Sequence, residues 1–265
     1  MLWMRFSLDG RPCFGTLDNG RIRLHEGDMF ESPVPTDRFI DSADVQWLTP
    51  CQPGKFICMW NNFHAAAAKQ SLAIPGEPLW FLKAASALRA HGESIVAPAA
   101  EVYDGRVVYE GELGVVIGRR CRDVSEADAP SAIFGYTCVN DVTALELIAR
   151  DPSFPQWARA KSFDSFGPFG PVIATGLDPS MLNVRTLVGG RERQNYPVAD
   201  MIFSPAQLVS RLSREMTLEP GDVISCGTSL GALPMRPGHV IEVAIDGIGV
   251  LRNEYTAAPA AAAAA

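Results

Sequence analysis

The sequence predicts a mixed, mainly β fold with a few short helices. The 265-residue chain contains 20 prolines and 23 glycines, which interrupt it too often for long helices. Short runs of β-branched and aromatic residues, such as residues 113–117, are typical of buried strands. Strand and helix patterns do not alternate regularly, which argues against a Rossmann fold or a TIM barrel.

The first 50 residues predict a small β-rich N-terminal domain. Asp9-Gly10 and Asn19-Gly20 each stand between two strand-like segments, and an Asn-Gly or Asp-Gly pair in that position is a strong hairpin signal. Residues 50–54 indicate a linker to a second, larger domain at 55–256. An alanine-rich tail, 257–265, follows, and we expect it to be a frayed terminus because it has no amphipathic face.

In the larger domain, residues 56–60 predict a buried strand, and the alanines that follow favour a helix capped by Asn61 or Asn62. Residues 79–83 predict a strand ending in Lys83. Residues 125–128 resemble a capping box and predict a helix that ends at Gly135. The remaining expected elements are strands at 136–140 and 223–226, helices at 144–149 and from Ser204 to about 215, and a hairpin at 240–251.

Composition excludes several classes of protein. The net charge is −7 and no Lys/Arg-rich run is present, so we expect neither a nucleic-acid partner nor docking to an anionic membrane. No apolar stretch is long enough to span a bilayer, and the first residues lack the layout of a signal peptide. Six cysteines without C-x-x-C spacing indicate reduced thiols, so a cytoplasmic location is expected.

Three carboxylates are candidate metal ligands. Glu110 and Glu112 stand two residues apart at the start of the buried run 113–117, so a strand places both on one face. Asp141 follows another predicted strand, and strand ends can meet. Three carboxylates form a hard oxygen site suited to Mg²⁺, with Mn²⁺ or Ca²⁺ as alternatives. The plainer alternative for Glu110 and Glu112 is a solvated strand edge. For Asp141 it is an N-cap for the helix at 144–149.

Other polar residues are candidates for acid–base chemistry. Lys161 lies in a segment rich in aromatic residues, glycine and proline that we expect to be an ordered loop; it could pair with a substrate carboxylate or move protons with a lowered pKa. Its alternative is a surface ion pair with Asp164. His64 is a candidate general base, although a lone histidine on a helix is more often structural.

Further candidates would bind substrate. Gly227 and Thr228 follow a buried strand and could hold an oxyanion, although a simple turn is the alternative. Lys83, at its strand end, is a fourth substrate-binding candidate beside Lys161. The chain contains no G-x-S-x-G elbow, no G-x-G-x-x-G and no Walker loop, which argues against a serine hydrolase and against nucleotide binding.

Five segments together resemble the fumarylacetoacetate hydrolase (FAH) superfamily, in the family's order and over residues 56–253. The resemblance implies an FAH-type β-roll catalytic domain, commonly a homodimer, and a metal ion, Mg²⁺ or Mn²⁺, held by Glu110, Glu112 and Asp141. It also implies that Lys161 and Thr228 line the substrate pocket. The segments are residues 109–118, 135–144, 161–168, 218–228 and 247–253.

The resemblance implies small 2-oxo or β-diketo acid substrates from aromatic catabolism. The leading hypothesis is hydrolysis of a C–C bond in an acylpyruvate or fumarylacetoacetate-like acid through a metal-stabilised enolate. One alternative is an isomerase or decarboxylase of a 2-hydroxyhepta-2,4-diene-1,7-dioate-type compound. Another is a catalytically silent member that binds metal and ligand.

One motif departs from the family's pattern. Hydrolytic and decarboxylating members typically carry Asn-Tyr, a His and then a Glu three residues later in a lid helix. This chain has Asn62-Phe63-His64 and alanine at position 67. We therefore expect His64 to act alone or with an acid from Glu77 or a partner chain.

Overall fold

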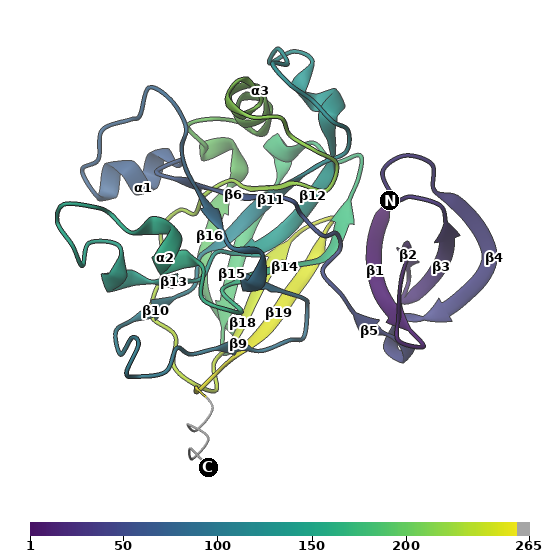
Figure 1. The fold of residues 1–265 in the computed structure, drawn as a ribbon, viewed down its shortest axis with the longest axis horizontal. Coiled ribbons are helices and arrows are strands. Elements are labelled where there is room, and N and C mark those ends of the chain that lie inside the picture. Colours follow the sequence, from purple (N-terminus) through teal and green to yellow (C-terminus); the bar gives the residue numbers. More distant parts are fainter. Residues whose placement is uncertain (259–265) are drawn as a thin grey trace.

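The computed structural model describes residues 1–258, and strands dominate it (Figure 1). The mainly β prediction is confirmed. Residues 259–265 of the predicted alanine-rich tail lie outside the described residues. Within residues 1–258, no helix has the length and apolar character that crossing a bilayer requires.

The N-terminal unit is a meander of antiparallel strands beside the main body (Figure 1). Both predicted hairpins are confirmed: Asp9-Gly10 and Asn19-Gly20 have positive φ, as two-residue turns of type I′ require. The unit joins the main sheet where Leu2 and Trp3 pair with β14. Its strands are β1 (Leu2–Leu8), β2 (Arg11–Asp18), β3 (Arg21–Glu26), β4 (Val34–Asp41) and β5 (Gln46–Trp47).

The larger body contains a curled sheet with the strand order β14-β12-β11-β17-β6-β7. The short β8, which comes directly after β7 in the chain, pairs in parallel with β14, so the sheet turns back on itself. Its strands are β6 (Phe56–Trp60), β7 (Leu79–Lys83), β8 (Leu88–Arg89), β11 (Gly111–Ile117), β12 (Ile133–Asn140), β14 (Gly167–Ala174) and β17 (Val223–Ser225).

A second sheet, of order β16-β15-β18-β19-β9, packs against the first. The predicted hairpin around Asp246-Gly247 is confirmed as the β18–β19 pair. The strands are β9 (Ile95–Val96), β15 (Asn183–Val188), β16 (Arg191–Pro197), β18 (Val240–Ile245) and β19 (Gly249–Thr256); β10 (Val107–Val108) and β13 (Thr143–Ala144) form a separate pair.

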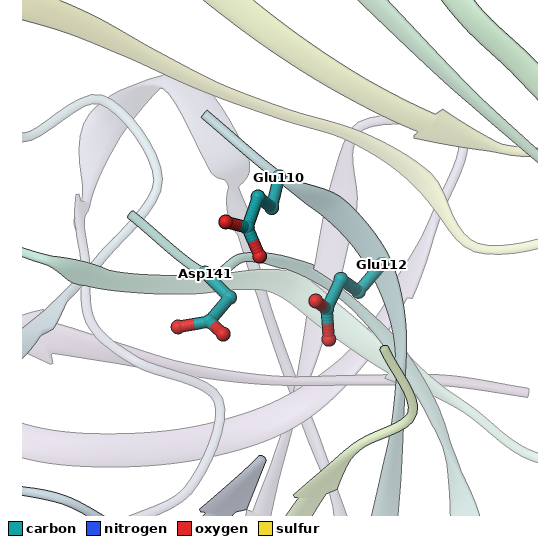
Figure 2. Close-up of side chains that lie close together, drawn as sticks. All are labelled: Glu110, Glu112 and Asp141. Carbon is teal, nitrogen blue, oxygen red and sulfur yellow. The ribbon is translucent and has the colours of Figure 1, made fainter. Parts of the chain in front are cut away.

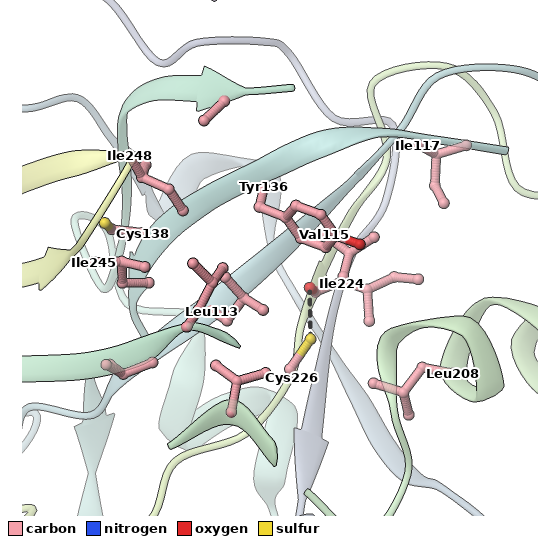
Figure 3. Packing of buried hydrophobic residues seen from close by; sticks show 14 of the residues in the cluster. Leu113, Val115, Ile117, Tyr136, Cys138, Leu208, Ile224, Cys226, Ile245 and Ile248 are labelled. Carbon is pink, nitrogen blue, oxygen red and sulfur yellow. Dashed lines mark hydrogen bonds between the residues drawn. The ribbon is translucent and has the colours of Figure 1, made fainter. Parts of the chain in front are cut away.

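Strand β11 is buried on both faces, which explains its unbroken apolar run. Leu113, Val115 and Ile117 belong to the core between the two sheets and α3 (Pro205–Glu215), where Figure 3 shows them with Leu208 of that helix. Val116, on the opposite face, packs in a second core with residues of β6, β7 and β12. Glu112 has the same parity as Val116 and therefore points to that second side.

Helix α3 begins at Ser204 as predicted, with a complete capping box: the Ser204 hydroxyl accepts from Gln207 N, and the Gln207 side chain accepts from Ser204 N. We expect Ser204→Ala to lower the free energy of unfolding by about 1 kcal/mol, because an amide of the first turn loses its partner. Chemical denaturation measures this, with Ser94→Ala in an exposed loop as the control. Equal midpoints for the two variants would contradict the capping role.

The asparagine cap predicted for the helix that follows β6 is wrong. Helix α1 (His64–Lys69) has Phe63 at its N-cap position and no side-chain cap. The buried Asn62 amide instead donates to the carbonyl oxygens of Phe203 and Cys226 and accepts from Phe203 N. Three backbone groups from distant segments thus satisfy this side chain, which keeps it away from the helix.

Two predicted helices are single 3₁₀ turns. Ser125 does accept from Asp128 N, but the turn that follows spans only Ala129–Ala132, because β12 begins at Ile133 and pairs with β11. The helix expected at 144–149 is the turn Leu145–Leu147, which follows β13. The loop expected from Lys161 onward is confirmed only in part: residues 162–166 are irregular, but Lys161 itself ends helix α2 (Trp157–Lys161) and β14 begins at Gly167.

Candidate metal centre

Alternation along the strands explains why the charged residues meet. Phe81 and Val139 point into the second core, and Lys83 and Asp141 follow them by two residues, on the same side. Glu112 projects from β11 to this side, and Glu110 precedes it by two residues. The end of the curled sheet therefore gathers charged groups at the rim of an apolar core.

The structure brings the three candidate carboxylates together. One oxygen from each of Glu110, Glu112 and Asp141 lies within 4.8 Å of the others, and Figure 2 shows the three groups turned toward a common space. Glu112 and Asp141 are fully buried, and the Glu110 side chain is 18% exposed. The Asp141 amide donates to the Glu110 carbonyl at 2.8 Å, which ties the two strand ends together.

Two buried lysines complete the cluster. Lys83 Nζ lies 2.5 Å from one oxygen of Asp141, and Lys161 Nζ lies 2.5 Å from the other. Lys161 also reaches Glu110 Oε2 at 2.9 Å. The alternatives in which Asp141 caps a helix and Lys161 pairs with Asp164 are thus not the ones that the structure adopts.

The carboxylates have different electrostatic environments. Burial opposes a charge on Asp141, but the ammonium groups of Lys161 and Lys83 outweigh it and lower the pKa of Asp141. Burial, reinforced by the Asp141 carboxylate, raises the pKa of Glu112 well above its ordinary value. For Lys161, burial opposes the charge, yet Asp141 and Glu110 raise its pKa. The raised pKa argues against the alternative in which Lys161 moves protons with a lowered pKa.

Glu112 carries the clearest sign that the cluster could hold a cation. Its Oε2 accepts from Ser225 Oγ at 2.5 Å and from Gly227 N at 2.9 Å. Its Oε1 is buried and has no hydrogen-bond partner in the described chain. A buried carboxylate oxygen without a partner is costly. An oxygen-rich site of this kind fits Mg²⁺, Mn²⁺ or Ca²⁺.

Gly227 and Thr228 form hydrogen bonds to residues of β11 and so help to hold the cluster in place. The Gly227 amide is engaged with Glu112. Thr228 Oγ1 donates to Gly111 O at 3.0 Å and accepts from Gln194 Nε2 at 2.8 Å. Gly111, between the two glutamates, is required because a Cβ there would lie 2.0 Å from the hydroxyl of Thr186 in β15.

A cavity of about 230 Å³ opens beside the cluster. Glu110, Lys161 and Thr228 line it on one side, whereas Glu112, Asp141 and Lys83 lie beneath its surface. The other lining residues are mostly apolar and come from β6, β7, β10, α1, α2, the turn at 145–148, Asn61 and the segments 70–72 and 229–232.

The structure does not bring His64 to this cavity. His64 is exposed, and the cavity is lined by Ala66 of α1 and by Gln70, the residue directly after this helix. Ala67, three residues after His64, is fully buried. Glu77 is exposed and is not among the residues that line the cavity.

Several supporting residues escaped the sequence reasoning. Ser225 holds Glu112, and Thr143 Oγ1 donates to Glu110 Oε1 at 2.8 Å. Ser225 stands two residues before Gly227, and Thr143 stands two residues after Asp141. The alternation of side chains along a strand could therefore have indicated both residues. Gln194 comes from a distant hairpin, and no local signal identifies it.

A family model described as "Fumarylacetoacetate (FAA) hydrolase C-terminal" matches residues 55–256. A second model, "Rv2993c-like, N-terminal", matches residues 1–50. Together the two models account for most of the chain.

Individual proteins resemble the whole chain. An uncharacterized protein of Archaeoglobus fulgidus is 41% identical over 94% of both chains. A 2,4-didehydro-3-deoxy-L-rhamnonate hydrolase of a Sphingomonas strain is 33% identical over 97% of this chain and 96% of its own. The crystal structure of a 2-hydroxyhepta-2,4-diene-1,7-dioate isomerase from Mycobacterium marinum superposes with a TM-score of 0.88, at 35% identity, over 97% of this chain and 98% of that chain.

Proposed function

Because the chain belongs to the fumarylacetoacetate hydrolase family, an enzyme family of hydrolases and isomerases, we propose that it is a divalent-metal-dependent hydrolase that cleaves a C–C bond in a small 2,4-dioxo acid. The observation that carries this proposal is the buried, unpartnered oxygen of Glu112 beside Glu110 and Asp141. The similar rhamnonate hydrolase supports the substrate class, since its name specifies an acid oxidised at carbons 2 and 4.

We propose that Glu110, Glu112 and Asp141 hold the ion. A divalent cation there would supply Lewis-acid polarisation of the substrate's 2-oxo group and carboxylate. Mg²⁺ is the proposed ion, with Mn²⁺ or Ca²⁺ as alternatives, because carboxylate oxygens serve all three.

The chain's own residues would position the acid. Lys161 Nζ lies beside Glu110 at the cavity wall and would pair with a substrate oxygen. Thr228 and Ser229 add hydroxyl groups at the same end. Lys83 is buried with Asp141 and would act by fixing that carboxylate, and Gly227 would act by fixing Glu112. The apolar lining limits access of bulk water.

In hydrolysis, water adds to the C4 carbonyl, the C3–C4 bond breaks and C3 takes up a proton, which yields a carboxylic acid and a 2-oxo acid. A base must accept the proton of the attacking water. We propose His64 for this role, which requires α1 to turn, because His64 is exposed in the present arrangement.

An isomerase is the second candidate. Position 67 is a buried alanine, so the lid lacks the family's water-activating glutamate. Isomerisation needs proton transfer but no attacking water. The similar Mycobacterium marinum isomerase supports this alternative.

We also propose a cytoplasmic homodimer. All six cysteines are free thiols, which fits a reducing compartment. The dimer follows from the family resemblance, and sedimentation equilibrium tests it.

A panel of 2-oxo and 2,4-dioxo acids tests the proposed function. We expect turnover with Mg²⁺, loss of turnover with EDTA and recovery when Mg²⁺ or Mn²⁺ is added back. Product analysis distinguishes the two reactions. Hydrolysis splits the substrate into two smaller acids, whereas isomerisation gives a single acid with the same formula as the substrate. Failure to bind any divalent ion at millimolar concentration in calorimetry would contradict the proposal.

A further inference from the structure

The cavity has charged side chains only beside the carboxylate cluster, where Glu110 and Lys161 line it. Its other polar lining residues are uncharged: Asn61, Gln70, Thr228 and Ser229. The rest of the wall is dominated by large apolar side chains, three of them aromatic. The ring of Trp157 stacks on that of Phe81 with centroids 5.5 Å apart and lies 5.4 Å from that of Trp60. The further apolar lining residues are Met59, Ala66, Leu72, Val108, Leu145, Ile148 and Ala232.

The cavity offers no free cation to a second carboxylate. Among its lining residues in the described chain, 1–258, Lys161 alone carries a positive charge. That charge is already shared by Glu110 and Asp141. A carboxylate at the far end would lose its hydration without gaining an ionic partner, which is a large penalty in an apolar wall.

The formal charge of the cluster also favours a ligand with a single carboxylate. Two lysines offset two of the three carboxylates and leave one negative charge. A divalent cation would convert this into one net positive charge. A ligand with one carboxylate neutralises that charge, whereas a dicarboxylate leaves an excess negative charge in a mostly buried site.

The polar atoms away from the cluster also disfavour an anion. Asn61 lines the cavity, and its Nδ2 donates to Ala73 O at 3.0 Å, which fixes the orientation of the amide. Its Oδ1 is buried and has no partner in the described chain. A carbonyl oxygen accepts hydrogen bonds only, so it suits a hydroxyl donor and repels a carboxylate.

We infer that this site takes 2-oxo acids with a single carboxylate and an uncharged, largely apolar distal group, and that it discriminates against dicarboxylates such as 1,7-dioates. The inference rests on the proposed function for the placement of the first carboxylate at the charged end. Trp60, Phe81 and Trp157 are the proposed specificity residues, because they contact the distal group.

Binding of a matched pair of acids tests the inference. 2-Oxooctanoate and 2-oxooctanedioate have the same chain length, differ at the far end and lack the 4-oxo group that hydrolysis needs. Trp60 and Trp157 line the cavity, so tryptophan fluorescence reports occupancy without turnover. With Mg²⁺ present we expect the monoacid to bind at least about tenfold more tightly, which corresponds to about 1.4 kcal/mol. Equal affinity, or preference for the diacid, overturns the inference.

Two variants at the C-terminal end of α1, one inside the helix and one directly after it, locate the discrimination. Gln70→Arg adds a cation at the cavity wall, and Ala68→Arg adds the same charge to an exposed position that does not line the cavity. We expect Gln70→Arg to improve diacid binding at least fivefold and Ala68→Arg to change it less than twofold. Equal improvement in both variants, or none in Gln70→Arg, contradicts the local origin of the selectivity.

The outcomes separate this inference from the proposed function. Tighter monoacid binding without turnover of any 2,4-dioxo acid refutes the hydrolase and keeps the inference. Turnover with a preference for 2,4-dioxoheptanedioate over 2,4-dioxoheptanoate keeps the hydrolase and refutes the inference. Absence of binding by both probes refutes the inference, and turnover of a 2,4-dioxo acid then decides the hydrolase by itself.

Discussion

Asp141→Asn is expected to be the most damaging single substitution in this chain. Asp141 is fully buried and is the shared partner of two buried ammonium groups, those of Lys83 and Lys161, at 2.5 Å each. Asparagine keeps one oxygen and can accept from only one of the two ammonium groups, and the negative charge that compensates both is lost. We therefore expect the free energy of unfolding to fall by about 3–5 kcal/mol, because a buried charge is left without compensation.

Chemical denaturation in EDTA measures this loss apart from any effect of metal. Asp246→Asn is the matched control, since Asp246 also pairs with a cation, Arg185, at 3.2 Å, but its side chain is 88% exposed. That control is expected to cost less than about 1 kcal/mol. If Asp141→Asn is as stable as the control, the buried ion pairs do not stabilise the fold in the way described.

Glu112→Gln is expected to separate stability from metal binding. Glu112 is buried beside Asp141, and burial and repulsion both penalise its charge. Glutamine retains an oxygen to accept from Ser225 and Gly227, and its amino group can donate toward the neighbouring carboxylates. The metal-free variant should therefore be at least as stable as the wild type.

The same substitution should abolish function. Loss of a ligand is expected to weaken divalent-metal binding by at least about 10²-fold, since loss of a partner that merely orients a ligand can already cost that much. Calorimetry with Mg²⁺ or Mn²⁺ measures the affinity, and denaturation in EDTA measures stability. Glu254→Gln, at an exposed position of β19, should change neither. A metal-free Glu112→Gln that is destabilised while its metal affinity is intact would assign Glu112 a purely structural role.

Although the two carboxylates are neighbours, the two substitutions are expected to have different effects on the free energy of unfolding. Asp141 is stabilised as an anion by two lysines, whereas Glu112 is left with one unpartnered oxygen. If the site had only a structural role, a charged Glu112 in an apolar environment would serve no purpose. A cation bound between Glu112 and Asp141 would explain why both carboxylates are kept there.

The sequence by itself determined the local elements. The Asp9-Gly10 and Asn19-Gly20 turns, the Ser204 cap and the apolar run of β11 follow from backbone preferences and side-chain alternation over a few residues. The same alternation brought Glu110 and Glu112 to one side of a strand. The place of Asp141 at the end of another predicted strand added it to the proposed site, and the resemblance to a family supplied the β-roll type of the catalytic domain.

Tertiary structure decided which partner each polar side chain takes. Lys83 and Asp141 lie 58 positions apart in the chain, and Lys161 and Glu110 lie 51 apart, so no local pattern could indicate that they pair. Asn62 bonds to segments more than 140 positions away instead of capping its own helix. Hydrogen bonds and ion pairs are short-ranged, so they depend on distances that only the curled sheet sets. For the same reason, only the folded chain shows that the charged lining residues of the cavity lie at the carboxylate cluster and that most of the other lining residues are apolar.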